Sequence, residues 1–81
     1  MNETLALVGY CPVCGQGRQF VMKDEHTGQF FVCCEDCEAE WPTPEAAKSS
    51  SLATRNQYAH ASFVTIDELA GHNWEPSIIN R

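Results

Sequence analysis

The chain has 81 residues with 11 acidic and 5 basic side chains, and its formal net charge is −6. A chain of this size has room for one small domain whose core supplies only about 3–5 kcal/mol, so a metal, disulfides or a partner is commonly needed. The negative charge repels a phosphate backbone and disfavours a nucleic-acid-binding module. No apolar stretch approaches the roughly 18 residues of a membrane span. Glu3, not a basic region, precedes the short apolar run 5–8, so we expect no signal peptide and a cytoplasmic location.

The first half of the chain predicts a β-hairpin. Residues 4–8 are either a short strand or a lead-in segment. Residues 18–23 and 29–33 are rich in β-prone side chains, and the turn residues between them end in Gly28, which can take a positive φ. Apolar side chains occur on both faces of this hairpin, so we expect the rest of the chain to cover it.

The second half predicts one or two helices. The first begins with Thr43 as N-cap and Pro44 in the first helical position, although the serines after it weaken any continuation. The second begins with a capping box of Thr65 and Glu68, and Gly71 ends it. We expect the apolar segment 74–79 to fold back as a loop or an edge strand.

The cysteines carry the strongest chemical pattern. Two Cys-x-x-Cys pairs, Cys11/Cys14 and Cys34/Cys37, are separated by 19 residues. An odd number of cysteines in a reducing compartment fits disulfides poorly, whereas two such pairs are typical of a four-cysteine zinc site. Cys33 alternates with Cys34 along an extended strand and faces the other way, so we expect Cys34 to be the ligand and Cys33 a packed free thiol.

Two other uses of these cysteines stay open. Cys-Pro-x-Cys also occurs in dithiol redox proteins, but the glycines after Cys14 break the helix that would lower the thiol pKa. Four thiolates can also hold iron, which would make the chain an electron carrier.

Cys11-Pro12-Val13-Cys14-Gly15, the hairpin, and Cys34-Glu35-Asp36-Cys37 followed by Trp41 together resemble a zinc ribbon. The resemblance implies two zinc knuckles joined by antiparallel strands, with structural Zn²⁺ held by the four paired cysteines. Glu38 departs from the family, which often has glycine there. We therefore predict an α+β fold in one domain, residues 1–81. A four-cysteine zinc ribbon occupies residues 10–41, and a helical extension over residues 42–81 covers its hairpin.

The segments 11–17 and 34–41, together with the small size of the chain, also resemble small bacterial orphan proteins. Some of these are immunity partners of secreted toxins. This resemblance implies an inhibitor that occludes a basic protein.

Nothing in the sequence predicts an enzyme. Asp67 and Glu68 are adjacent and are explained by helix capping. A zinc ion held by four thiolates has no open position for water, so we expect a non-enzymatic protein. The three histidines are expected to be solvated or to lie at the edge of the core: His26, His60 and His72.

The acidic charge is concentrated beside the second cysteine pair. Such a segment can be a solvated face, or it can steer a basic partner into contact. Trp41 beside it, or Trp74, could anchor such a partner or belong to the core. The sequence thus favours a protein-binding module over a transcription-type ribbon bound to nucleic acid or an iron carrier. Its predicted partner-binding residues are Glu35, Asp36, Glu38, Glu40 and Trp41.

Overall fold

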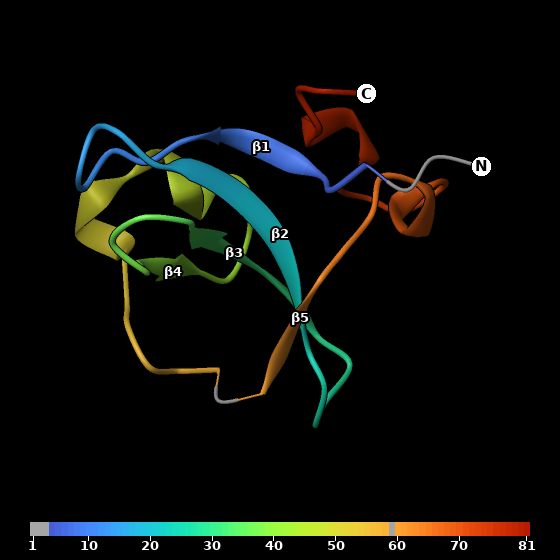
Figure 1. The fold of residues 1–81 in the computed structure, drawn as a ribbon, viewed down its shortest axis with the longest axis horizontal. Helices are drawn as coiled ribbons and strands as arrows, with labels where there is room; N and C mark the ends of the chain where they lie inside the picture. Colours follow the sequence, from blue (N-terminus) through green and yellow to red (C-terminus); the bar gives the residue numbers. More distant parts are fainter. Residues whose placement is uncertain (1–3, 59) are drawn as a thin grey trace.

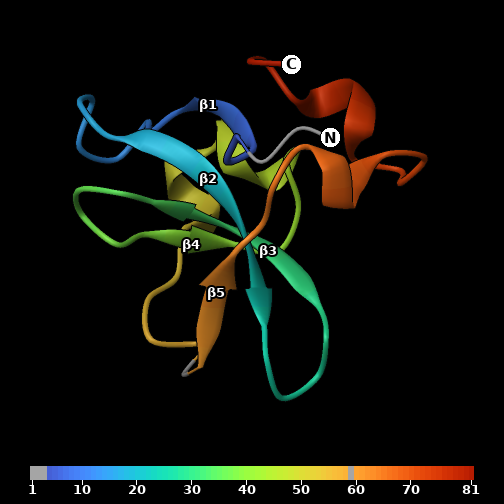
Figure 2. The same cartoon turned by 45° about the vertical axis from the view of Figure 1, so that its right-hand side comes forward.

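A computed structural model describes residues 4–58 and 60–81. These residues form an antiparallel sheet centred on the second strand (Figure 1). Its strands are β1 (Leu7–Tyr10), β2 (Arg18–Asp24), β3 (Phe30–Cys34), β4 (Glu40–Trp41) and β5 (Ala61–Phe63). One edge of β2 pairs with β3, which in turn pairs with β4. The other edge is divided between β1 along its first half and β5 along its second half (Figure 2).

The predicted hairpin is confirmed as β2 and β3. Cα partners run from Gln19 with Cys34 to Lys23 with Phe30. Gly28 has φ 75° in the connecting turn, and its N–H donates to the Asp24 carbonyl oxygen at 2.7 Å. The strand that follows the first cysteine loop, β2, is therefore directly paired with β3, the strand that leads into the second cysteine loop.

The predicted covering helices are wrong. After β4, the helices in the described residues are single 3₁₀ turns, two before β5 and two after it. No helix among these residues is long and apolar enough to cross a membrane. The turns are η1 (Ala46–Lys48), η2 (Ser50–Leu52), η3 (Asp67–Leu69) and η4 (Glu75–Ser77).

The helix-start signals are present but the helices do not continue. Thr43 Oγ1 accepts from the Ala46 N–H at 3.1 Å, yet Ser49 is extended at φ −117° and ψ 122°. Thr65 and Glu68 form the predicted capping box, with each backbone N–H 3.3 Å from the other side chain. Each start is followed by too few helix-favouring residues to offset the cost of nucleation.

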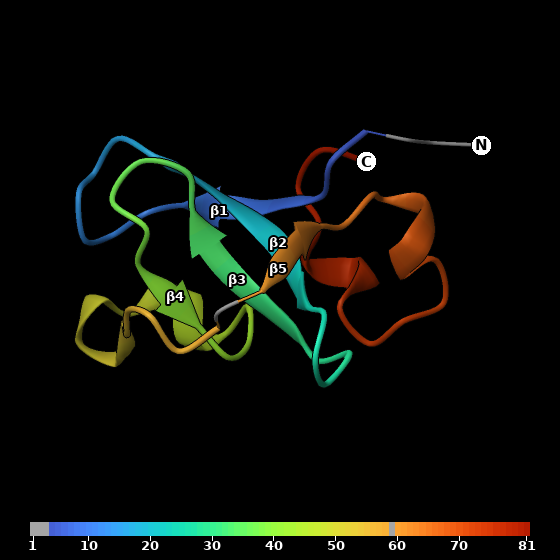
Figure 3. The same ribbon diagram turned by 60° about the horizontal axis from the view of Figure 1, so that its bottom comes forward.

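The sheet buries one face under these turns, in two apolar clusters. The first contains Ala6, Val21, Val64, Ile66, Leu69 and Ile78. The second contains Cys11, Val32, Cys34, Ala39, Trp41 and Ala47. Val8 and Trp74 pack against both, so the two clusters are continuous. Figure 3 shows η3 and η4 at one end of the molecule and the cysteine-bearing loops at the other.

The C-terminal segment folds back on the sheet, as predicted. After η4, the Ile79 N–H donates to the Leu7 carbonyl oxygen at 2.9 Å. The Asn80 side chain accepts from the Leu7 N–H at 3.0 Å and donates to the Leu5 carbonyl oxygen at 2.9 Å. The end of the chain therefore satisfies backbone groups of the β1 segment.

Trp41 lies at the centre of the second cluster, with 0% of its surface exposed. Its indole N–H donates to the Ser49 carbonyl oxygen at 2.9 Å, which ties the η1–η2 segment to β4. This burial corrects the prediction that Trp41 is an exposed anchor for a partner. The side chain is part of the core.

We predict that Trp41→Phe lowers the free energy of unfolding by about 1–3 kcal/mol, because it removes the part-buried hydrogen bond from the indole N–H to the Ser49 carbonyl oxygen and leaves a void in the core. Denaturant titration of the metal-loaded protein measures the change. Leu52→Ala is the control, since Leu52 is 56% exposed and its loss should change stability by less than about 0.5 kcal/mol. Equal stability of Trp41→Phe and the parent chain would contradict the prediction.

Candidate metal centre

Two loops bring four cysteines together at one end of the sheet. The β1–β2 loop carries Cys11 and Cys14, and Cys34 and Cys37 lie where β3 enters the loop to β4 (Figures 1 and 3). All four sulfur atoms lie within 4.8 Å of one another. The Cys11 and Cys37 sulfurs are 3.6 Å apart, and those of Cys14 and Cys34 are 3.7 Å apart.

Backbone N–H groups of the first loop point at its sulfurs. The Val13 N–H lies 3.3 Å from Cys11 Sγ, and the Gly17 N–H lies 3.4 Å from Cys14 Sγ. The Cys11 N–H closes the loop by donating to the Gly17 carbonyl oxygen at 2.8 Å. Such donors stabilise thiolates, the form in which cysteine binds a metal.

The second loop repeats this arrangement. The N–H groups of Asp36 and Cys37 lie 3.3 and 3.4 Å from Cys34 Sγ, and the Cys34 N–H donates to the Ala39 carbonyl oxygen at 2.9 Å.

The residue after each Cys-x-x-Cys pair is left-handed. Gly15 has φ 73° and Glu38 has φ 63°. Glu38 therefore takes the conformation that glycine favours at the matching position of the first loop, and the departure from the zinc-ribbon pattern leaves the loop geometry intact.

The four sulfurs fit a tetrahedral metal ion. With metal–sulfur bonds of about 2.3 Å, the sulfurs of a zinc tetrahedron lie about 3.8 Å apart. Two of the sulfur pairs, at 3.6 and 3.7 Å, are near that value, and all lie within 4.8 Å. Four thiolates in this arrangement suit zinc or iron. The site could thus hold one metal ion.

The thiols of the site differ in acidity. Hydrogen bonds from the backbone N–H groups of Gln16 and Gly17 lower the pKa of Cys14 to about 6. Burial raises the pKa of Cys34 to about 12. A bound cation favours the thiolate form at such a site, so metal binding and deprotonation of Cys34 are coupled.

Cys33 lies outside the sulfur cluster. Its thiol is half-buried on the opposite face of β3 and lies 3.5 Å from the Cys34 carbonyl oxygen. Burial and the nearby charge of Glu40 raise its pKa to about 11. The structure thus places Cys34, not Cys33, beside the other three sulfurs.

A salt bridge that sequence reasoning missed joins the two loops. Arg18 Nε and Nη2 donate to the Glu35 carboxylate at 2.7 and 3.0 Å, and the Arg18 backbone N–H donates to the same group at 3.0 Å. The Glu35 N–H returns a bond to the Arg18 carbonyl oxygen at 3.0 Å. The guanidinium lowers the pKa of Glu35 below its usual range. No sequence pattern links the two residues, because their pairing depends on the hairpin register.

The predicted acidic strip is divided by the fold. Glu35, Asp36 and Glu38 are exposed on the second loop. Glu40 is only 7% exposed, and its carboxylate accepts from the Gln57 N–H at 2.9 Å, which corrects its prediction as a partner-binding residue.

The histidines lie outside the sulfur cluster. The rings of His26 and His60 meet edge to face with centroids 4.6 Å apart. His72 Nδ1 accepts from the Trp74 N–H at 3.0 Å.

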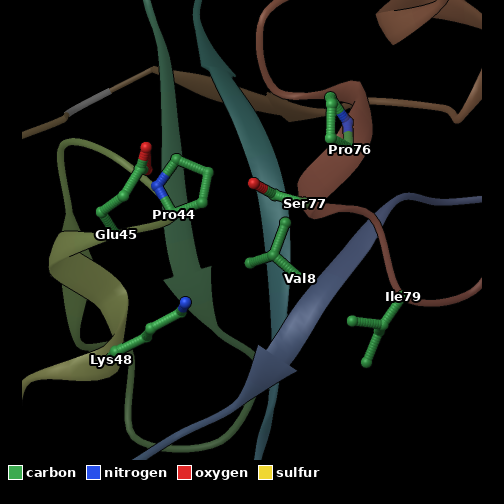
Figure 4. A pocket seen from close by; sticks show the side chains of 7 residues that line it. All are labelled: Val8, Pro44, Glu45, Lys48, Pro76, Ser77 and Ile79. Atoms are coloured by element: carbon green, nitrogen blue, oxygen red, sulfur yellow. The ribbon is translucent and has the colours of Figure 1, made fainter.

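A hollow of about 280 Å³ lies where the η1 and η4 segments approach each other over β1. Figure 4 shows the Lys48 ammonium and the Ser77 hydroxyl pointing from opposite segments into the space beside Val8. Glu45 and Lys48 are both exposed at its rim. The hollow is a junction between two covering segments.

The chain matches no family model, no curated protein and no solved structure.

Gly17 gives a test of how tightly the two loops are packed. A Cβ at this position would overlap the Cys34 sulfur and lie 2.9 Å from Asp36 Cβ. We predict that Gly17→Ala weakens metal binding by roughly 5–150-fold, as expected for overpacking that costs about 1–3 kcal/mol. Competition with a chromophoric chelator measures the affinity.

Gly28→Ala is the matched control. Its Cβ would meet nothing within 4 Å, although φ 75° makes the backbone strained. It should cost about 1–2 kcal/mol of stability and leave metal affinity unchanged. Equal metal affinity in the Gly17 and Gly28 variants would contradict the packing described here.

Proposed function

We propose that the four-cysteine centre holds one structural Zn²⁺ ion. The observation that carries this is the convergence of Cys11, Cys14, Cys34 and Cys37, with all sulfurs within 4.8 Å. Zinc binding in such small sites contributes about 10–16 kcal/mol, and this free energy stabilises the folded state of a protein whose core is small. A four-thiolate zinc has no open position, so the proposed role is structural and non-enzymatic.

The purified protein should be colourless and contain one zinc per chain. Cys34→Ser should weaken zinc binding by about 100-fold or more, because four ligands share the binding free energy. Cys33→Ser should keep full zinc content, since Cys33 lies outside the cluster. Elemental analysis and chelator competition measure both. A red protein with one iron and no zinc would replace the proposal with an iron electron carrier.

We further propose that this zinc-held scaffold is a protein-binding module for a basic partner, most concretely an inhibitor or immunity protein of a bacterial toxin. The exposed acids of the second loop, Glu35, Asp36 and Glu38, and the net charge of −6 support it. The bound metal would hold these acids in fixed positions. Acidic surfaces of this kind speed association with basic proteins.

The charges on the hairpin disfavour the alternative of a nucleic-acid-binding ribbon. Only Arg18 and Lys23 carry positive charge on β2, and β3 has none. Arg18 is already paired with Glu35. This leaves Lys23 to meet a phosphate backbone, which is too little for a stable complex.

We predict that Asp36→Lys/Glu38→Lys slows capture of a basic partner by about tenfold or more, because steering depends on local charge. The zinc-loaded chain serves as bait in its native cell extract, and mass spectrometry identifies the protein that it retains. Association rates are then measured with that purified protein. Zinc content should stay at one per chain.

Glu45→Lys/Asp67→Lys is the matched control, since it changes net charge equally at two exposed acids outside the second loop. Equal capture by the test and control variants would refute the acidic-face proposal. Salt-dependent binding to nucleic acid, with no protein retained, would favour the transcription-type ribbon instead.

A further inference from the structure

The outer face of the sheet, opposite the two core clusters, contains a second hollow of about 210 Å³. Its lining comes from β2, β3, β5 and the second cysteine loop: Phe20, Met22, Cys33, Cys34, Glu35, Glu38 and Phe63. The register explains why these side chains meet. Phe20 is the Cα partner of Cys33, and Met22 is the partner of Phe63, so each pair shares a face.

This hollow is apolar and only partly covered. The Tyr58 ring stacks on Phe31 at 3.9 Å with an interplanar angle of 5°, which closes the neighbouring part of the same face. Phe63 meets Phe20 edge to face at 5.5 Å and still leaves 54% of its surface exposed. Met22 and Cys33 are half-buried. Apolar surface in a hollow of this kind is available to a partner's side chain.

The charge at the rim indicates which partner fits. The Arg18 guanidinium lies 5.4 Å from the centre of the Phe20 ring, but its charge is balanced by Glu35. Glu38 is exposed and belongs to no ion pair within residues 4–58 and 60–81. The Arg55 guanidinium donates to the neighbouring Cys37 carbonyl oxygen at 3.2 Å and forms no ion pair with Glu38. The rim therefore keeps an unpaired carboxylate beside an apolar floor.

We propose that this outer-face hollow binds an apolar side chain of a partner segment in which lysine or arginine flanks that side chain. The apolar group enters between Phe63 and Met22, and a flanking cation meets Glu38. A second copy of this chain is a poorer occupant, because its charge of −6 would repel the first. This inference rests on the proposed function, a basic protein partner, and names the docking position and the kind of segment.

The test uses the full zinc-loaded chain labelled with ¹⁵N and a synthetic probe, acetyl-Lys-Lys-Leu-Lys-Lys-amide. Titration followed by NMR should give saturable shifts at the amides of Phe20, Met22, Cys33 and Phe63. The matched peptide with glycine in place of leucine should bind at least about fivefold more weakly, because it has no group for the hollow. The peptide with glutamates in place of lysines should give no shifts.

Two variants locate the contact. Phe63→Ala and Glu38→Lys should each weaken probe binding at least about fivefold, through lost apolar area and reversed charge respectively. Leu52→Ala removes an equally exposed apolar side chain outside the hollow and should bind as the parent chain does.

The outcomes separate this inference from the proposed function. Equal binding of the leucine and glycine peptides, or shifts outside the hollow, would overturn the inference even where the acidic loop is needed to capture a whole partner. Saturable peptide binding that depends on Phe63 and Glu38 would support the hollow as a docking site. Unchanged partner capture after charge reversal at Asp36 and Glu38 would refute only the proposed function.

Discussion

The close approach of four cysteine sulfurs is the constraint on which the rest of the structure depends. Two loops that are distant in sequence must meet with sulfur atoms as near as 3.6 and 3.7 Å. Four thiolates at such distances repel one another unless a cation lies between them. Backbone N–H groups aimed at Cys11, Cys14 and Cys34 favour the thiolate form, and a bound cation would favour it further. The local geometry of both loops therefore suits a site that could hold one metal ion.

The same constraint fixes the hairpin register. β2 starts directly after Gly17 and β3 ends at Cys34, so joining the loops aligns Gln19 with Cys34. This register directs Val21 and Val32 into the covered core. It also leaves Cys33 on the outer face, beside Phe20. A shift by one residue would exchange the two faces of a strand, and the loops would no longer meet. The centre and the outer-face hollow thus follow from one alignment.

Features encoded by local chemistry were predictable from the sequence. The spacing of the cysteine pairs identified the four residues that meet, and the turn ending in Gly28 located the hairpin. The capping box at Thr65 is also present, but the cap alone did not determine the length of the element that follows. Helix length depends on the residues after the cap and on tertiary packing, which these short segments satisfy with single turns.

Features that depend on packing between distant segments were not predictable. The pairing of Arg18 with Glu35 requires the hairpin register, and the division of one β2 edge between β1 and β5 requires the whole topology. Trp41 and Glu40 lie in an acidic stretch of sequence, yet both are buried, because the η1–η2 segment covers Trp41 and the segment around Thr54 pairs with Glu40. Exposure follows from what covers a residue, which its immediate neighbours in sequence do not reveal.

The bonds made by Asn80 have a consequence for the order of folding. They join residues separated by 73 and 75 positions, almost the full length of the chain. Contacts of such high sequence separation carry a large loop-closure entropy and form slowly when nothing shortens the loop. The cysteine loops enclose a much shorter segment, so with the proposed metal ion they can close first. Closure of the metal loops would bring β1 beside β2 while the C-terminal segment is still free, so during synthesis a centre could assemble before the last residues are available to dock.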